Sequence, residues 1–187
     1  MRSSPASWVV VALVGAAACT VGDHLHVITG VLWYPRPVFW QQAWWVPLLF
    51  AGASIVIAGA AGPLRAALGG RAEEVSGRRV LADGIAFMTA YAFTAYGHTL
   101  PNVVLVVLVA AWVARVVAGV PPWLVIFSLL VAVGGSLFEA GFSKLGFFYY
   151  HVPDFIGVPR WLPALYLHVA LLAAGMARRL LEPAAQR

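Results

Sequence analysis

Six apolar stretches of about 20 residues constrain the fold of this chain more than any other feature. They cover about residues 7–29, 43–62, 80–98, 102–120, 122–143 and 161–181. A helix needs roughly 20 residues to cross a hydrocarbon core of about 30 Å. Backbone groups in lipid must be paired internally, and these stretches lack the alternation of a barrel strand. The sequence therefore predicts an all-α, polytopic membrane protein with six transmembrane helices.

The composition agrees with this prediction. Apolar residues make up 62% of the 187 positions and charged residues 10%, whereas soluble domains have about 45–50% and about 25%. Six helices leave room for short connections only. We therefore expect residues 1–187 to form a single transmembrane domain.

The basic residues predict the orientation, because they concentrate on the cytoplasmic side of a membrane. Nine belong to segments on the side of the N-terminus, and three to the opposite side. The nine are Arg2, Arg65, Arg71, Arg78, Arg79, Arg115, Arg178, Arg179 and Arg187; the three are Arg36, Lys144 and Arg160. Both termini are thus expected in the cytoplasm. The net charge of +5 then reflects topology and anionic lipid contact, and no nucleic-acid partner is expected.

A cleaved signal peptide is the alternative for the first stretch, which has a basic start and small residues. Its removal would put the remaining five helices in conflict with the charge distribution. We therefore interpret the first stretch as a transmembrane helix. Cys19 lies within it, and a single cysteine cannot form an intrachain disulfide.

The third stretch carries its polar and aromatic side chains on one face. Asp83, Phe87, Tyr91, Thr94 and His98 follow at steps of four, four, three and four residues, which confines them to a sector of about 80° on a helix. Such a face is costly against lipid, so it should point to the bundle interior. Either a cavity or a closed, hydrogen-bonded core satisfies this requirement.

Two other groups of polar residues lie within apolar stretches. Glu139 either pairs locally with Ser143 and Lys144 or faces a cavity. Asp23 and His26, in GDHLHVITG, share a helical face and are expected to pair near the outer interface. A metal pair there would need further ligands from other helices. The candidate cavity lining is Asp83, Phe87, Tyr91, Thr94, His98, Glu139, Phe142, Asp23, His26 and Trp45.

Sequence motifs for catalysis are missing. The chain has five mostly isolated histidines and no GxSxG, HExxH, phosphate-binding glycine loop or CxxC. We expect neither enzymatic activity nor a metal, and no cofactor beyond a bound lipid. A membrane enzyme acting on lipid is the alternative; it requires at least two of Asp23, His26, Asp83, His98 and Glu139 to converge. A small transporter would need inverted halves, and neither these nor a repeat of 20–50 residues is evident.

Two sequence motifs are similar to those of the insulin-induced gene (Insig) proteins of the endoplasmic reticulum. One is AWWVP at the start of the second helix: Ala43, Trp44, Trp45, Val46 and Pro47. The other leads into the sixth helix: Pro153, Asp154, Phe155, Trp161, Leu162 and Pro163. Arg178 and Leu180 follow at the positions of the family's closing basic motif. The chain thus resembles a six-helix Insig protein.

The resemblance implies a non-enzymatic, lipid-sensing membrane protein. Animal members bind oxysterols within the helix bundle and retain a sterol-sensing escort protein and hydroxymethylglutaryl-CoA reductase. Here Ala114 precedes Arg115, whereas the animal proteins have an Asp there for engaging the escort. We therefore carry over only the fold and the intramembrane lipid site, with an unidentified membrane protein as a further partner.

The amino-acid usage indicates a bacterial source. Eleven of the twelve basic residues are Arg, and the chain is rich in Ala, Val and Gly, as is typical of GC-rich bacterial genomes. The expected location is the bacterial plasma membrane. Most bacteria lack sterols, so we expect a neutral lipid that is diacylglycerol-like or sterol-like. Small residues along the helices favour close packing and homo-oligomers.

Overall fold

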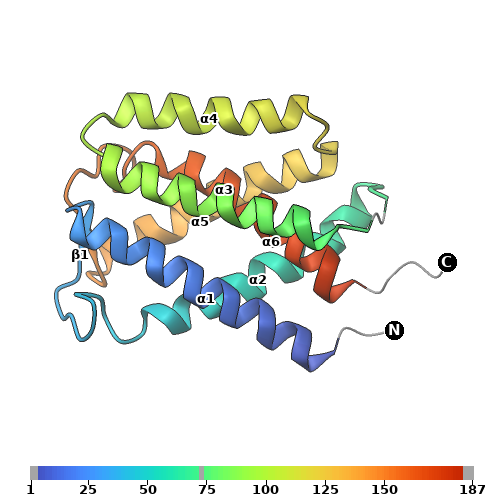
Figure 1. Ribbon diagram of the computed structural model, residues 1–187. Coiled ribbons are helices and arrows are strands. Elements are labelled where there is room, and N and C mark those ends of the chain that lie inside the picture. The colour runs from blue at the N-terminus through green and yellow to red at the C-terminus, as the bar shows by residue number, and fades with distance from the viewer. Residues whose placement is uncertain (1–3, 72–73, 183–187) are drawn as a thin grey trace.

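The computed structural model describes residues 4–71 and 74–182. In this part of the chain, six helices confirm the predicted class (Figure 1). They are α1 (Pro5–Ile28), α2 (Val46–Ala67), α3 (Gly77–Gly97), α4 (Pro101–Val117), α5 (Pro122–Lys144) and α6 (Leu162–Met176), which continues as the π-helix η1 (Ala177–Leu181). Two short strands, β1 (Leu32–Trp33) and β2 (Tyr149–Tyr150), pair antiparallel.

The helix starts follow local capping chemistry. The Ser4 and Ser76 side chains accept hydrogen bonds from backbone N–H groups in the first turns of α1 and α3. Prolines occupy the first turns of the other four helices, where no N–H partner is needed. The second helix differs from the prediction because residues 43–45 form a turn before it. It also continues past Pro63 to Ala67, as membrane helices tolerate an internal proline.

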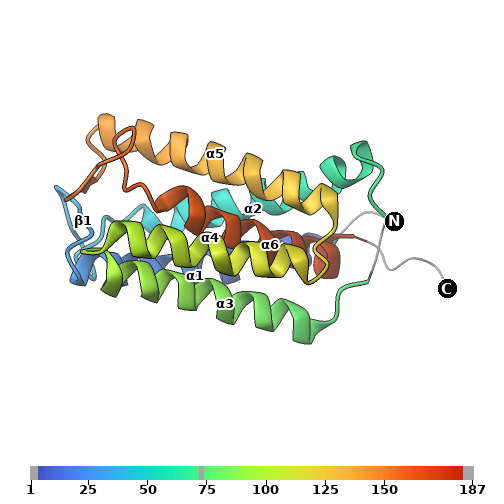
Figure 2. The same ribbon diagram turned by 90° about the horizontal axis from the view of Figure 1, so that it is seen from above.

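Among the described residues, four helices are long and apolar enough to cross a membrane: α1, α2, α5 and α6 with η1. The apolar α4 is shorter, with 17 residues, and α3 carries the polar face. Figures 1 and 2 place α6 inside the bundle, where it contacts α2, α3, α4 and α5. The two strands lie at one end of the bundle, the strand end. The start of α1 and the end of η1 lie at the other, the terminal end. Arg2 and Arg187, used for the orientation, are outside the described residues.

The chain contains two equivalent units, α1–β1–α2 and α5–β2–α6, whose residues correspond at a constant spacing of 116. Gly30 follows α1 with φ +77°, and Gly146, 116 positions later, follows α5 with φ +80°. The same turn then recurs: Phe39 bridges to Gln42, and Phe155 bridges to Val158. Trp45 and Trp161 precede α2 and α6 at the same spacing. Most of the backbone hydrogen bonds of these connections therefore recur at equivalent positions.

The strands relate the two units by an approximate two-fold rotation. Trp33 of β1 pairs with Tyr149 of β2, and these two residues occupy equivalent positions in the two units, 116 residues apart. Their rings stack with centroids 4.8 Å apart. Both α1 and α5 run from the terminal end to the strand end (Figure 1). The rotation axis consequently runs along the bundle, and α3 and α4 connect the two units.

Candidate functional site

A cavity of about 770 Å³ lies between α1, α2, α5 and α6, with α3 contributing part of its wall. This volume is in the range of small-molecule binding sites, about 300–1,000 Å³. The lining is mostly apolar. Leu48 and Val56 of α2 and Leu130 of α5 belong to it, yet they are 65%, 71% and 56% exposed. The cavity therefore opens sideways between α2 and α5, toward the membrane.

Two carboxyl groups line this cavity at the strand end. Asp23, near the end of α1, accepts hydrogen bonds at Oδ2 from the Tyr34 hydroxyl (2.9 Å) and from Gln42 Nε2 (2.6 Å). Glu139, near the end of α5, accepts the Tyr150 hydroxyl at Oε2 and the Tyr166 hydroxyl at Oε1. Each carboxyl thus has two donors from the protein.

The two carboxyl groups are equivalent in the repeated units. Asp23 and Glu139 are 116 residues apart, and each accepts from a tyrosine eleven residues later, Tyr34 or Tyr150. The ring of Phe148 contacts both tyrosines, with centroids 5.9 Å from Tyr34 and 5.6 Å from Tyr150. We define the first half-site as Asp23, Tyr34 and Gln42, and the second as Glu139, Tyr150 and Tyr166. Phe148 joins them at the end of the cavity.

The electrostatics of the half-sites make the tyrosines donors. Burial raises the pKa of the Tyr34 phenol well above its usual value, and the nearby Asp23 raises it further. Burial and then Glu139 have the same effect on the pKa of Tyr150. Both phenols therefore keep their protons at neutral pH, while the carboxyl groups accept. Among the described residues lining the cavity, no Lys or Arg accompanies these acids.

Five of the ten candidate residues line the cavity: Asp23, His26, Phe87, Tyr91 and Glu139. The Glu139 carboxyl bonds to tyrosines from β2 and α6 rather than to Ser143 or Lys144. The remaining candidates are Asp83, Thr94, His98, Phe142 and Trp45, and the structure places them outside the lining.

The expectation for Asp83 was wrong because arginines hold it at the terminal end. Arg115 of α4 donates to Asp83 Oδ1, and Arg79 Nε lies 3.4 Å from the same oxygen. Asp83 is 5% exposed, and a buried carboxylate requires such partners. It therefore joins α3 to α4 instead of facing the cavity.

The expected pairing of Asp23 with His26 was also wrong. His26 Nε2 lies 2.8 Å from Thr94 Oγ1, and the Thr94 hydroxyl donates to the Tyr91 carbonyl. Because that hydroxyl has one proton to give, His26 must be the donor to Thr94. The contact joins α1 to α3, and Thr94 is completely buried by it.

The other three candidates lie around the strand end. His98 Nδ1 lies 2.7 Å from the Ala95 carbonyl at the end of α3. Phe142 and Trp45 belong to an aromatic cluster with Phe147, in which the ring centroids of Phe142 and Phe147 are 4.8 Å apart. The Trp45 ring also contacts the ring of Tyr34 in the first half-site, with centroids 5.8 Å apart.

The motif residues support the site rather than forming it. Trp161 is 1% exposed, and its ring contacts His26. Asp154 binds Arg160 through both the backbone N and Nε, each at 2.7 Å, which fixes the turn before α6. Leu162 is the motif residue that reaches the cavity.

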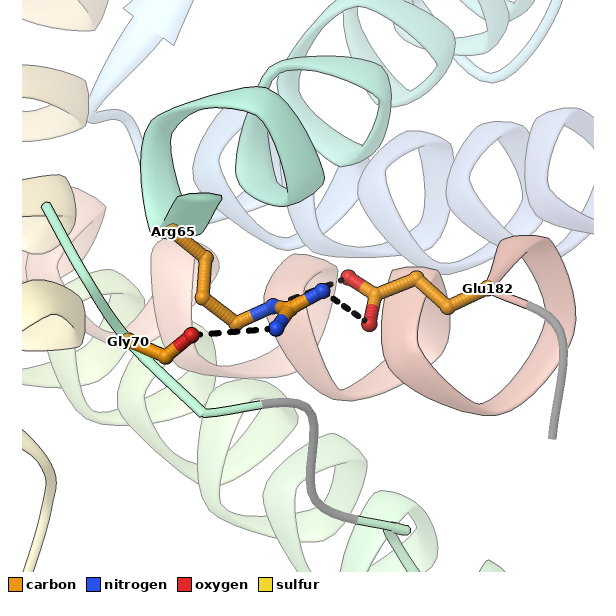
Figure 3. Close-up of polar contacts among 3 residues, drawn as sticks. All are labelled: Arg65, Gly70 and Glu182. Carbon is orange, nitrogen blue, oxygen red and sulfur yellow. Dashed lines mark hydrogen bonds and ion pairs between the residues drawn. The ribbon is translucent and has the colours of Figure 1, made fainter. Parts of the chain in front are cut away.

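An ion pair between Arg65 and Glu182 joins two segments at the terminal end of the bundle (Figure 3). Arg65 of α2 donates from Nη2 to Glu182 Oε2 at 2.9 Å, and from Nη1 to the Gly70 carbonyl at 3.2 Å. Leu64 and Met176, which line the cavity, are close to these residues in the chain. The contact therefore ties α2 to the end of η1 below the cavity.

Sequence reasoning missed Tyr34, Gln42, Tyr150 and Tyr166. Tyrosine and glutamine in connections are unremarkable alone, and Tyr166 lies in an apolar helix. A usable signal was the recurrence of an acid followed by tyrosine eleven residues later. Within residues 4–71 and 74–182, no three His, Cys, Asp or Glu side chains are grouped to hold a metal ion.

Comparisons with known proteins agree with this architecture. No family model matches the sequence. The chain is 34% identical over 182 residues to an INSIG protein homolog from Mycolicibacterium vanbaalenii, covering 93% of this chain and 86% of that protein. The crystal structure of MvINS, an Insig homolog from Mycobacterium vanbaalenii, has a TM-score of 0.83 at 30% identity and 96% coverage of both chains. A cross-linked trimer of an MvINS variant has a TM-score of 0.82 at 30% identity and 95% coverage of both.

Proposed function

Because this integral membrane protein belongs to the Insig family, we propose that it binds a neutral lipid in its intramembrane cavity and acts as a non-enzymatic lipid sensor or regulator. The cavity between α1, α2, α5 and α6 carries the proposal. Its apolar walls suit acyl chains or a sterol body, and its side opening gives access from the bilayer. The polar end of the cavity, whose described lining has no Lys or Arg, suits a small uncharged head, diacylglycerol-like or sterol-like.

Native mass spectrometry of protein purified in mild detergent tests this function. We expect a neutral lipid to remain bound and to be identified after extraction. Added diacylglycerol or an oxysterol should exchange with it. Absence of any bound lipid, together with no binding of either added lipid, would contradict the proposal.

Cys19 provides a second measurement, because it is the only cysteine in the chain and lines the cavity. A membrane-permeant maleimide should react with it more slowly when diacylglycerol is present. The control is Leu81→Cys in a Cys19→Ser background, because Leu81 is exposed, and the reaction of this variant should not change. Equal rates at Cys19 with and without lipid would count against occupancy of this cavity.

The enzyme alternative has no observation in its favour among the described residues. It required acids and histidines to converge, but the hydrogen bonds formed by Asp23, His26 and Glu139 go to tyrosine, glutamine and threonine side chains. A lipid that purifies unchanged and is not consumed supports a binding role.

We further infer a bacterial plasma membrane location with both termini cytoplasmic. Arg65, Arg71, Arg79 and Arg115 lie on segments at the terminal end, which supports this orientation. A homo-oligomer is also proposed, and the cross-linked trimer of the MvINS variant supports it. Native mass spectra would report the oligomer together with its lipid.

A further inference from the structure

We infer that Asp23 selects the ligand: its free oxygen Oδ1 accepts a hydrogen bond from the unesterified hydroxyl of a lipid alcohol. The inference rests on the proposed lipid binding and names the chemical group that the cavity recognises. It follows from a difference between two half-sites that the repeated units otherwise make equivalent.

The two carboxyl groups differ in how completely the protein satisfies them. Both donors to Asp23, Tyr34 and Gln42, reach Oδ2. No other described residue donates to Oδ1, although Asp23 lines the cavity and is 5% exposed. Glu139 has one phenol on each oxygen. Asp23 therefore has one oxygen without a protein donor, whereas each oxygen of Glu139 has one.

The repeat identifies what is missing at Asp23. The hydroxyl of Tyr166, on α6, donates to Oε1 of Glu139. The equivalent residue 116 positions earlier, on α2, is Phe50. Both side chains line the cavity. Phenylalanine has no hydroxyl, so the first unit lacks the donor that the second unit supplies itself. A ligand hydroxyl would donate to Oδ1 of Asp23 as the Tyr166 hydroxyl donates to Oε1 of Glu139.

A second difference leaves space for that hydroxyl. The Tyr166 ring lies against Gly135, where an added Cβ would be only 2.4 Å from the ring. The equivalent of Gly135 in the first unit is Cys19. A ring placed at Phe50 as the Tyr166 ring is placed would come as close to the Cβ of Cys19 as to the Cβ added at Gly135. The space beside Asp23 therefore belongs to the cavity, which the ring of Tyr91 also lines next to Gly22.

The chemistry of the open acceptor defines the ligand class. An acceptor left unpaired in an apolar site is costly, so a donor is favoured there. A free hydroxyl supplies one, whereas an ester oxygen only accepts. An anionic phosphate would bring an unpaired charge into a lining without Lys or Arg. The site should accept lipid alcohols and discriminate against their fully esterified and phosphorylated forms.

Competition between dioleoylglycerol and its acetate ester tests the inference. The two lipids differ in whether the third glycerol oxygen carries a hydrogen or an acetyl group. The purified full chain should prefer the alcohol by about fivefold, the value of one hydrogen bond. Native mass spectrometry reports both bound species in one sample. Equal binding of the two lipids would overturn the inference and leave the proposed function intact; binding of neither would overturn both.

Asp23→Asn should abolish or reverse this preference. Tyr34 and Gln42 donate to one oxygen, so the amide nitrogen takes the position of Oδ1 and offers a donor to the ester. Glu139→Gln is the matched control at the equivalent position, and it should keep the preference for the alcohol. An unchanged preference in a folded Asp23→Asn protein would overturn the inference.

A transplant of the second half-site gives an independent test. Cys19→Gly with Phe50→Tyr makes the first unit like the second, so a protein phenol fills Oδ1 and the preference for the alcohol should fall toward unity. Cys19→Gly alone is the control and should retain it. If the double variant keeps the full preference while its unfolding temperature matches the control, Oδ1 is not the acceptor.

Discussion

At the scale of single residues, the half-sites consist of acids that are held by neutral donors. Tyr34 and Tyr150 come from equivalent positions and perform the same task for Asp23 and Glu139. Their rings also pack on Phe148. Each phenol therefore contributes both to the shape of the cavity and to the satisfaction of a buried acceptor.

Removing either phenol hydroxyl should destabilise the protein to a similar extent. Tyr34→Phe and Tyr150→Phe each leave a buried carboxyl with one donor fewer, which costs about 1–3 kcal/mol. Thermal unfolding in detergent measures the loss. The control is Tyr149→Phe at a position that is 39% exposed and stacked on Trp33, with a change under about 0.5 kcal/mol expected. No loss in either half-site variant would contradict the assigned hydrogen bonds.

Asp83 and Arg115 form the other residue contact on which the bundle depends. Arg115→Met removes a donor from a carboxylate that is 5% exposed, so we expect a cost of about 3 kcal/mol or more. Arg79, whose side chain is 58% exposed, contributes less, and Arg79→Ala should cost under about 1 kcal/mol. Comparable unfolding temperatures for the two variants would argue against a dominant Arg115 contact.

At the scale of elements, the connections between helices are built on unusual backbone conformations. Gly30 ends the first unit's helix at φ +77°, with nothing within 4 Å of an added Cβ. Gly30→Ala should therefore cost about 1 kcal/mol through backbone strain alone. Gly141, inside α5, also faces open space, and Gly141→Ala should be neutral or stabilise by up to about 1 kcal/mol. Chemical denaturation of both variants checks the difference, and equal effects would contradict it.

The helices could be predicted from sequence because each apolar stretch spans a membrane by itself. The polar face of α3 was recognised, but its environment was not. Asp83, Tyr91 and Thr94 share that face but lie at different depths along the helix. Asp83 contacts arginines, Tyr91 lines the cavity, and Thr94 contacts His26. Helical spacing gives direction around the axis, whereas the neighbour at each depth depends on other helices.

The repeated units escaped sequence reasoning for a related reason. Their spacing of 116 residues far exceeds the periods of common repeats, because α3 and α4 lie between them. The units share backbone geometry, such as the bridges at Phe39 and Phe155. Their identical residues, such as Trp45 and Trp161, are scattered rather than gathered in one continuous motif. The half-sites could be found as intramembrane acids, but their tyrosine donors required the fold.

At the scale of the whole molecule, the bundle has two chemically distinct ends, and its proposed orientation can be measured. Arg36 lies between β1 and α2 at the strand end, and Glu74 lies in the α2–α3 connection; both are exposed. In a Cys19→Ser background, a membrane-impermeant maleimide should label Arg36→Cys in intact cells. Glu74→Cys should react only after the membrane is permeabilised. The reverse pattern would place the termini outside.

The pairing of Trp33 with its own equivalent, Tyr149, makes this chain comparable to a homodimer whose subunits have been fused through α3 and α4. A true homodimer cannot break its symmetry by substitution, since every mutation appears twice. In a fused pseudo-dimer each half can diverge alone. Phe50 and Tyr166 differ in this way: one half keeps a fixed phenol as an internal substitute for ligand, while the other leaves the position to be filled from the membrane.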